Sequence, residues 1–362
     1  MTYLQSYIGF NAPSLSVTAR RNAGLPIWRN PDNYRIIGDA NNRRLVVLDV
    51  EGRIKHGNAP VYRGFLISPE TPFGHPCQPE PIFIKFPHGS EIGLYEWLEK
   101  EKETLTALID IPRVPRFLAA GQADIIEYQR FGQDWHDWLK NGNQPPYPYK
   151  MPFIVISSVN GTAMNAFSDQ TLKFVPSRQR LGWLTGTVLA GASELLARVH
   201  DHGIIHRDLK PAHILYDQEE QIVGLIDFGS STRIADRPIN GHFGTLAFFP
   251  PEYVFEPPEK EDPRIDAYSI GSTAFTLASG GGHIHYGERL PVDTVYNFVE
   301  NIWAYRSAGV AELIKESNLP AELKETSFAR YIFQLMHPDI NQRPINMREI
   351  ADNFRRIGAE LG

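Results

Sequence analysis

Short apolar runs bounded by turn-forming residues dominate the first part of the chain. LVVLDV at 45–50, VYRGFLI at 61–67 and IFIKF at 82–86 have the length and the β-branched or aromatic content of strands, with Gly, Asn and Pro between them. FIVIS at 153–157 is another apolar run of strand length. This pattern predicts a small β-rich region.

Helical periodicity marks two other stretches. Residues 91–109 are rich in Glu and Lys and are typical of a helix. From Leu181 onward, apolar residues recur at steps that share one helix face, at Leu184, Val188, Ala192, Leu195 and Val199. Strands followed by helices predict an α+β fold with two lobes. Two lobes joined by one segment leave a cleft in which a ligand can bind.

The pattern also suggests domain boundaries. Residues 1–36 show little periodicity and contain three prolines, so they are interpreted as an N-terminal extension. Residues 37–158 form the predicted N-terminal lobe, with a proline-containing surface insert at about 133–150, and residues 159–362 form the predicted C-terminal lobe.

Composition narrows the class of protein. The chain is 42% hydrophobic and 22% charged, which is ordinary for a globular protein. Its net charge of −6 gives no basic field to attract nucleic acid, and no apolar run is long enough to span a membrane. The single cysteine, Cys77, cannot form an intramolecular disulfide. We expect a cytoplasmic protein without a membrane span, and composition leaves its oligomeric state open.

Two aspartates lie in segments that suit phosphoryl transfer. Asp208 lies in IIHRDLKPAHIL, and Asp227 follows in LIDFGS. In this chemistry one carboxylate receives the proton of the attacking hydroxyl, and another holds the metal that bridges the phosphates. HRD at 206–208 followed by DFG at 227–229 resembles the catalytic loop and the metal-binding loop of protein kinases. The resemblance implies the bilobal kinase fold, ATP and a divalent metal.

The resemblance assigns further residues over about 45–355. Lys85 resembles the strand lysine that binds the α- and β-phosphates. Glu101 resembles its helix partner, chosen over the neighbouring glutamates because Leu105 and Leu108 place it near the apolar face. Lys210, in DLKP, resembles the lysine of serine/threonine kinases that neutralises charge on the γ-phosphate.

Three more residues resemble architectural positions of the family. Glu252 in PPE and Arg343 in NQRP resemble a buried salt bridge that closes the activation segment, here residues 227–252. Asp266 resembles the helix acid that ties down the catalytic-loop backbone. In the nucleotide site, the resemblance places Ile156 at the gatekeeper position and Ser157 to Val159 at the hinge.

The phosphate-covering loop departs from the family pattern. Only Gly52 and Gly57 precede Val61, where the family has three spaced glycines that let backbone amides approach the phosphates. Phe83 stands where alanine is usual, and because residues two apart share a strand face, its ring is expected to project toward the adenine position. Three alternatives are open for this ring: it fills the nucleotide pocket, it folds aside to stack on the base, or the strand that carries it is shifted.

His213 replaces the asparagine that holds a second magnesium in the family. Mg²⁺ prefers oxygen ligands, whereas imidazole suits Mn²⁺ and other transition metals, so a ligand role for His213 predicts a preference for Mn²⁺. A core or capping role is the alternative. With Asp227, His213 completes the candidate metal site.

The activation segment lacks the usual phosphate acceptors. Residues 233–244 contain no Ser, Thr or Tyr, although Arg207 resembles an arginine that pairs with a phosphorylated segment. We expect charge pairs or a partner to hold the segment, and we expect the Thr245 hydroxyl to contact Asp208.

These observations favour a serine/threonine protein kinase acting on a protein substrate, with Asp208 as the base. The alternative is a pseudokinase, a binding or scaffolding module whose cleft is plugged by Phe83 and whose surface recruits a partner protein. A small-molecule kinase of the aminoglycoside- or choline-kinase type is disfavoured, because those enzymes lack a long activation segment ending in a Pro-Pro-Glu-like element such as that before Tyr253.

Overall fold

A computed structural model describes most of the predicted elements. The described residues are 34–40, 44–54, 61–67, 80–87, 92–124, 150–166, 178–234, 236, 245, 248–250, 252–253, 259–279, 319 and 321–362. Gly57, residues 1–33 and residues 133–149 of the predicted insert lie outside these ranges. The chain divides into two compact units, one of residues 1–106 with 116–158, and one of residues 107–115 with 159–362. Residues 107–115 thus belong to the second unit, a division that sequence order alone does not indicate.

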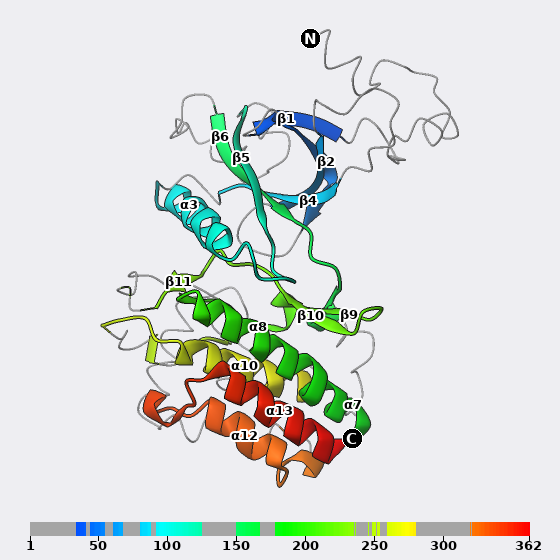
Figure 1. The fold of residues 1–362 in the computed structure, drawn as a ribbon, viewed down its shortest axis with the longest axis vertical. Helices are drawn as coiled ribbons and strands as arrows, with labels where there is room; N and C mark the ends of the chain where they lie inside the picture. The colour runs from blue at the N-terminus through cyan, green and yellow to red at the C-terminus, as the bar shows by residue number, and fades with distance from the viewer. Residues whose placement is uncertain are drawn as a thin grey trace, which may run out of the picture. The chain divides into compact units, whose positions relative to one another are not determined.

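Among its described residues, the first unit has a six-stranded antiparallel sheet in the order β1-β2-β3-β4-β6-β5 and one helix, α3 (Figure 1). The four strands predicted from apolar runs are confirmed as β2, β3, β4 and β6, and the predicted helix is α3. The strands β1 and β5, which no strong pattern indicated, form the two edges. The bounds are β1 Tyr34–Ala40, β2 Arg44–Ile54, β3 Val61–Ile67, β4 Glu80–Lys85, α3 Ile92–Ala107, β5 Phe117–Asp124 and β6 Lys150–Ser157.

Alternation along β4 separates a core face from a site face. Ile82 and Ile84 are 1% and 0% exposed, and beyond the strand the ring of Phe86 lies between those of Tyr62 and Phe153, with centroid distances of 6.0 and 5.8 Å. This apolar packing fixes the strand in the middle of the sheet. The opposite face of β4 carries Phe83 and Lys85.

The second unit is mainly helical. Its small sheets are β7 (Thr162–Ala163) with β9 (Ile214–Asp217) and β10 (Ile222–Leu225), and β8 (Ile204–Ile205) with β11 (Thr232–Arg233). The helices are α7 Arg178–Trp183, η2 Leu184–Leu189, α8 Ala190–Asp201, η3 Pro211–His213, α10 Arg264–Ala278, η7 Ala321–Leu323, α12 Ser327–Leu335, η8 Ile340–Gln342 and α13 Met347–Leu361. Within the described residues, no helix combines the length and apolar character needed to cross a bilayer.

The predicted amphipathic helix is present as the continuous run α7–η2–α8, and its predicted apolar positions are buried. Its middle, η2, is a π-helical turn that the sequence pattern did not predict. Helix α10 is buried along almost its whole length and forms the centre of the unit. Helix α13 packs against α7, η2 and α8 (Figure 1).

Candidate active site

Asp266 on helix α10 holds the backbone of the catalytic loop in place. Asp266, in the first turn of α10 and 0% exposed, accepts hydrogen bonds from the backbone amides of His206 and Arg207, each at 2.9 Å, and from Nε2 of His200 at 2.8 Å. Burial by itself would raise the pKa of Asp266, but these hydrogen bonds outweigh it and the pKa is lowered. The carboxylate is therefore charged at neutral pH, and it orders the backbone that leads into Asp208.

Asp208 is a buried carboxylate surrounded by donors. Its Oδ1 accepts a hydrogen bond from the backbone amide of Thr245 at 2.7 Å, and its Oδ2 accepts one from Nζ of Lys210 at 3.0 Å. The hydroxyl of Thr245 lies 2.6 Å from the same Lys210 nitrogen. The expected contact of Thr245 with Asp208 is thus made by the backbone amide, while the hydroxyl contacts Lys210. The structure brings these three predicted residues together.

His213 lies between the two aspartates. Its Nδ1 is 2.7 Å from the backbone carbonyl of Asp208, and its Nε2 is 3.2 Å from Oδ2 of Asp227. A carbonyl oxygen can only accept, so Nδ1 carries a proton and donates to it, and Nε2 is the ring nitrogen that faces Asp227.

The backbone turns Asp227 toward His213. Both Asp227 and Arg207 have a φ of 66°, a left-handed conformation that is strained for residues other than glycine and is concentrated at functional sites. Phe228 is 0% exposed, and its ring centroid lies 4.7 Å from that of His206. Burial of the ring of Phe228 fixes the neighbouring Asp227, whose side chain remains 41% exposed.

The donor set at this place fits a divalent metal. One ligand atom each from Asp208, His213 and Asp227 lies within 4.8 Å of the other two. Carboxylate oxygens and imidazole nitrogens are ligand types that divalent metals take in proteins. The half-exposed Asp227 leaves this set open to solvent on one side.

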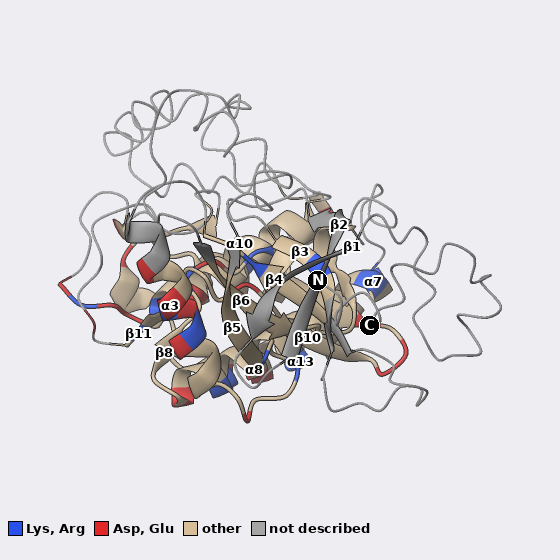
Figure 2. Ribbon diagram, turned by 90° about the horizontal axis from the view of Figure 1, so that it is seen from above, with Lys and Arg blue, Asp and Glu red and all other residues tan. Residues whose placement is uncertain are grey.

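The first unit contains the predicted lysine–glutamate pair. Nζ of Lys85 donates to Oε1 of Glu101 at 2.7 Å, and both side chains are under 10% exposed. Glu101 lies on the buried face of α3, whereas Glu99 pairs with Lys102 at 2.7 Å and Glu103 is exposed. Acidic and basic residues alternate along α3 (Figure 2). Glu101 pairs with Lys85 because it is the glutamate on the buried face of this helix.

Strand register gathers several predicted nucleotide-site residues on one face of the sheet. Val61 lies directly opposite Lys85 in the β3–β4 pair, and Ile156 lies opposite Phe83 in the β4–β6 pair. Residues directly opposite each other point to the same face, as do residues two apart on one strand. Val61, Phe83, Lys85 and Ile156 therefore share a face, and the half-buried Phe83 occupies part of it.

The remaining predicted nucleotide residues are placed differently. Gly52 lies inside strand β2, not in a loop, and Gly57 lies outside the described residues. The Ser157 amide donates to the Arg116 carbonyl at 2.9 Å, and the Ser157 hydroxyl accepts from the Arg116 amide at 2.9 Å. The Ser157 amide is therefore already engaged within the first unit. Val159 is half-buried in the second unit.

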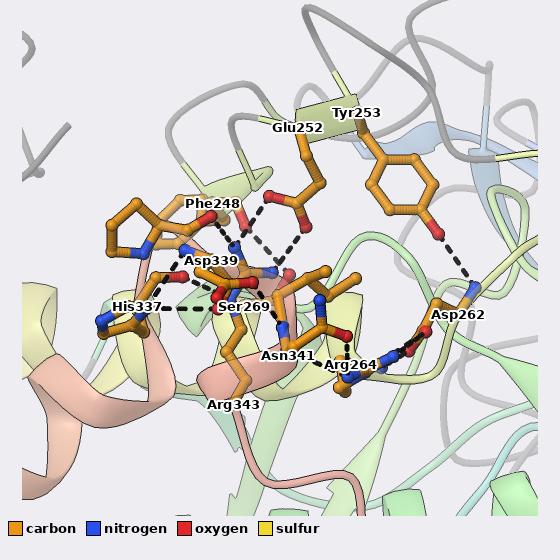
Figure 3. Close-up of polar contacts among 12 residues, drawn as sticks. Phe248, Glu252, Tyr253, Asp262, Arg264, Ser269, His337, Asp339, Asn341 and Arg343 are labelled. Atoms are coloured by element: carbon orange, nitrogen blue, oxygen red, sulfur yellow. Dashed lines mark hydrogen bonds and ion pairs between the residues drawn. The ribbon is translucent and has the colours of Figure 1, made fainter. Parts of the chain in front are cut away.

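The end of the activation segment is clamped by the predicted salt bridge (Figure 3). Nη1 and Nη2 of Arg343 contact the two carboxylate oxygens of Glu252 at 2.5 and 2.7 Å, a bidentate geometry. The Arg343 guanidinium also lies 4.9 Å from the centroid of the Tyr268 ring. Ser269 donates to the carbonyl of Phe248 at 2.9 Å, so α10 supports the segment as well.

One charged residue near the catalytic loop was missed by sequence reasoning. Glu261 is 3% exposed, and its carboxylate faces the guanidinium of Arg207. It lies in a charged stretch, EKEDPR, that is typical of a solvated loop. The only available signal was indirect, namely that Arg207 needed an anionic partner.

Comparison with known proteins agrees with this geometry. Residues 151–353 match the family model "Protein kinase domain". Mitogen-activated protein kinase kinase kinase 5 of Homo sapiens is 32% identical over 186 residues, which are 51% of this chain and 12% of that protein. Serine/threonine-protein kinase pkn2 of Myxococcus xanthus is 29% identical over 278 residues, 73% of this chain and 27% of that protein. Serine/threonine-protein kinase PknB of Mycolicibacterium smegmatis is 30% identical over 135 residues, 36% of this chain and 20% of that protein.

The matched segments cover well under two thirds of each of these relatives. The family match, in contrast, spans more than half of this chain and contains both the catalytic loop and the metal-binding loop. The chain therefore belongs to the protein kinase family.

Proposed function

We propose that this chain is an active serine/threonine protein kinase that transfers the γ-phosphoryl group of ATP to a hydroxyl of a protein substrate in the cytoplasm. The observation that carries this proposal is the convergence of Lys210 and Thr245 on the buried carboxylate of Asp208, whose backbone carbonyl contacts His213. The arrangement combines a base, a cation for the transferred phosphate and a metal site, which are the parts that phosphoryl transfer requires. The cytoplasmic location rests on the single cysteine.

Each residue has a defined role in the proposed reaction. Asp208 accepts the proton of the attacking hydroxyl as the new oxygen–phosphorus bond forms and the bond to the β-phosphate oxygen breaks, which releases ADP. Lys210 places positive charge where the γ-phosphoryl group passes. In the first unit, Glu101 holds Lys85 in position to bind the α- and β-phosphates. A bound divalent ion at Asp227 and His213 would supply further neutralisation of phosphate charge.

The alternative, a pseudokinase, draws on Phe83. Its ring lies on the same face of the sheet as Lys85 and Val61, where a nucleotide base would have to fit. The two functions are separated by measuring thermal shifts with ATP and Mg²⁺ or Mn²⁺, followed by ADP formation. Binding with turnover supports the kinase, whereas binding without turnover, or no binding, supports the pseudokinase.

The metal ion that best supports activity should depend on His213. We expect the wild type to show a kcat/KM about tenfold higher with Mn²⁺ than with Mg²⁺ at matched free metal, and we expect His213→Asn to reverse this order, because an amide oxygen suits Mg²⁺. Steady-state kinetics with both metals measures it. His202→Asn, at a partly exposed histidine that contacts Asp110, is the control. Equal activity with the two metals in the wild type would contradict a ligand role.

Nucleotide affinity should respond to the volume at Phe83. We expect Phe83→Leu and then Phe83→Ala to bind ATP progressively more tightly, because each removes atoms from the face that Lys85 shares. Isothermal titration calorimetry measures the affinity of each variant. Weaker binding by both variants would show instead that the ring stacks on the base.

A further inference from the structure

A buried ion pair lies directly beside the candidate base. Nη1 of Arg207 is 3.3 Å from Oε1 of Glu261, and the two side chains are 2% and 0% exposed. Charges buried this deeply are costly unless an opposite charge faces them. Because Arg207 immediately precedes Asp208, whatever fixes the guanidinium of Arg207 also restrains the backbone of the catalytic loop.

Glu261 is also joined to the activation segment at Asp236. Its backbone amide donates to the carbonyl of Asp236 at 2.8 Å. Burial raises the pKa of Tyr253, and the negative charge of Glu261 raises it further. The Tyr253 hydroxyl in turn accepts a hydrogen bond from the amide of Asp262 at 2.9 Å (Figure 3). Glu261 thus connects Arg207 with Asp236, and its neighbour Asp262 contacts Tyr253, the residue that follows Glu252.

The adjacent part of the segment is held by backbone hydrogen bonds to the same region. Strand β11, at Thr232–Arg233, pairs with β8, which leads directly into the catalytic loop. The amide of Ile234 donates to the carbonyl of Gly203 at 2.8 Å. Residues 232–234 and 236 are therefore ordered against the catalytic loop and Glu261.

The sequence offers no phosphate acceptor at this place. Residues 233–244 contain no Ser, Thr or Tyr. Phosphorylation orders such segments by placing a negative group opposite an arginine. In this chain a carboxylate already faces Arg207. We infer that Glu261 is a permanent counter-ion of Arg207 that holds the catalytic loop, residues 232–234 and Asp236 in place without phosphorylation. This inference rests on the proposed function and specifies how that site is regulated.

Glu261 acts through Arg207, so it is a positioning residue. Its loss removes none of the groups of the candidate site but frees the loop that carries Asp208. A shift of about 1 Å in a reacting group lowers turnover by about 10²-fold. The effect should appear in kcat, because the loop positions the base, and not in the KM for ATP.

The first test uses the 362-residue chain freed of phosphate with a phosphatase and checked by intact mass. We expect the wild type to keep its turnover after this treatment, and Glu261→Gln to lose about 10²-fold in kcat with little change in the KM for ATP. Glu259→Gln makes the same charge change at an exposed position in the same loop and should match the wild type. Glu261→Asp retains the charge and should recover part of the lost kcat.

Two readouts do not depend on turnover. Hydrogen exchange at the amides of Ile234 and Glu261 should be faster in Glu261→Gln than in the wild type. The Tm should fall by about 10 °C in Glu261→Gln, because Arg207 is left buried without its counter-ion, but far less when the same change is made in an Arg207→Met background. The double variant also provides a folded protein if Glu261→Gln alone is unstable.

The inference is overturned if phosphatase treatment abolishes wild-type turnover, or if folded Glu261→Gln retains full kcat and unchanged exchange. Equal losses of Tm in the two backgrounds would also overturn it, because they would show that Glu261 is not coupled to Arg207. If the wild type has no turnover at all, the proposed function fails on its own, and the exchange and Tm measurements still decide whether Glu261 holds the segment.

Discussion

Asp208→Asn should lower kcat for phosphoryl transfer by about 10³-fold while leaving ATP binding and Tm close to those of the wild type. Asparagine has nearly the same shape and can still accept the hydrogen bond from the Thr245 amide through its oxygen. It cannot take the proton of the attacking hydroxyl, and it removes the negative charge that Lys210 faces at 3.0 Å. Turnover measured as ADP formation, with thermal shift as the folding check, tests this expectation.

The matched control for Asp208→Asn is Asp352→Asn. Asp352 lies on the exposed side of α13, where its side chain is 73% exposed and pairs with Arg355, so the same chemical change should leave kcat unaltered. If Asp208→Asn retained turnover within a few-fold of the wild type, Asp208 would not be the base.

Gly358→Ala should destabilise the protein by about 3 kcal/mol, seen as a fall in Tm of about 10 °C. A Cβ at Gly358 would lie 2.5 Å from both Cα and N of Gly186 and 2.9 Å from the carbonyl oxygen of Gly182. All of these are backbone atoms, so the contact between α13 and the α7–η2 run could be relieved only by moving a helix. Circular dichroism during heating gives the Tm.

The higher helix propensity of alanine opposes this loss of stability. The steric clash with backbone atoms is the larger effect, so the net change is destabilising. In an exposed helix, replacing Gly by Ala stabilises by about 1 kcal/mol. Gly362→Ala, at the end of the same helical stretch, is the control, because the nearest atom to its Cβ would be the carbonyl oxygen of Gly358 at an ordinary 3.5 Å. It should leave the Tm nearly unchanged. A Tm for Gly358→Ala at or above that of the wild type would show that the two helices do not approach as closely as described.

The fold was largely predictable because the spacing of apolar residues along the chain reflects which side chains are buried. The apolar runs that became β3, β4 and β6, and the apolar spacing along α7–η2–α8, are direct consequences of one face meeting a core. Strand β5 was missed because its sequence, FLAAGQAD, contains no β-branched residues, and its strand conformation comes from pairing with β6. The π-helical turn at η2 likewise leaves the spacing of buried residues intact and so gives no signal.

In the candidate site, too, some residues could be predicted from the sequence and others could not. Asp208, Lys210, His213 and Asp227 lie in short contiguous segments, so their sequence context indicates them, and the choice of Glu101 followed from its place on the apolar face of α3. Glu261 could not be found this way. Its burial depends on the approach of the activation segment and the catalytic loop, and no local pattern distinguishes it from the exposed Glu259.

Phosphoamino-acid analysis after incubation with γ-labelled ATP and Mn²⁺ tests the central claim most directly. The wild-type chain is incubated with a general protein substrate beside Asp208→Asn, and the labelled protein is hydrolysed. The account predicts label in phosphoserine or phosphothreonine with the wild type and almost none with Asp208→Asn. Label that stays in ATP with the wild type, or equal transfer by the two proteins, would contradict it.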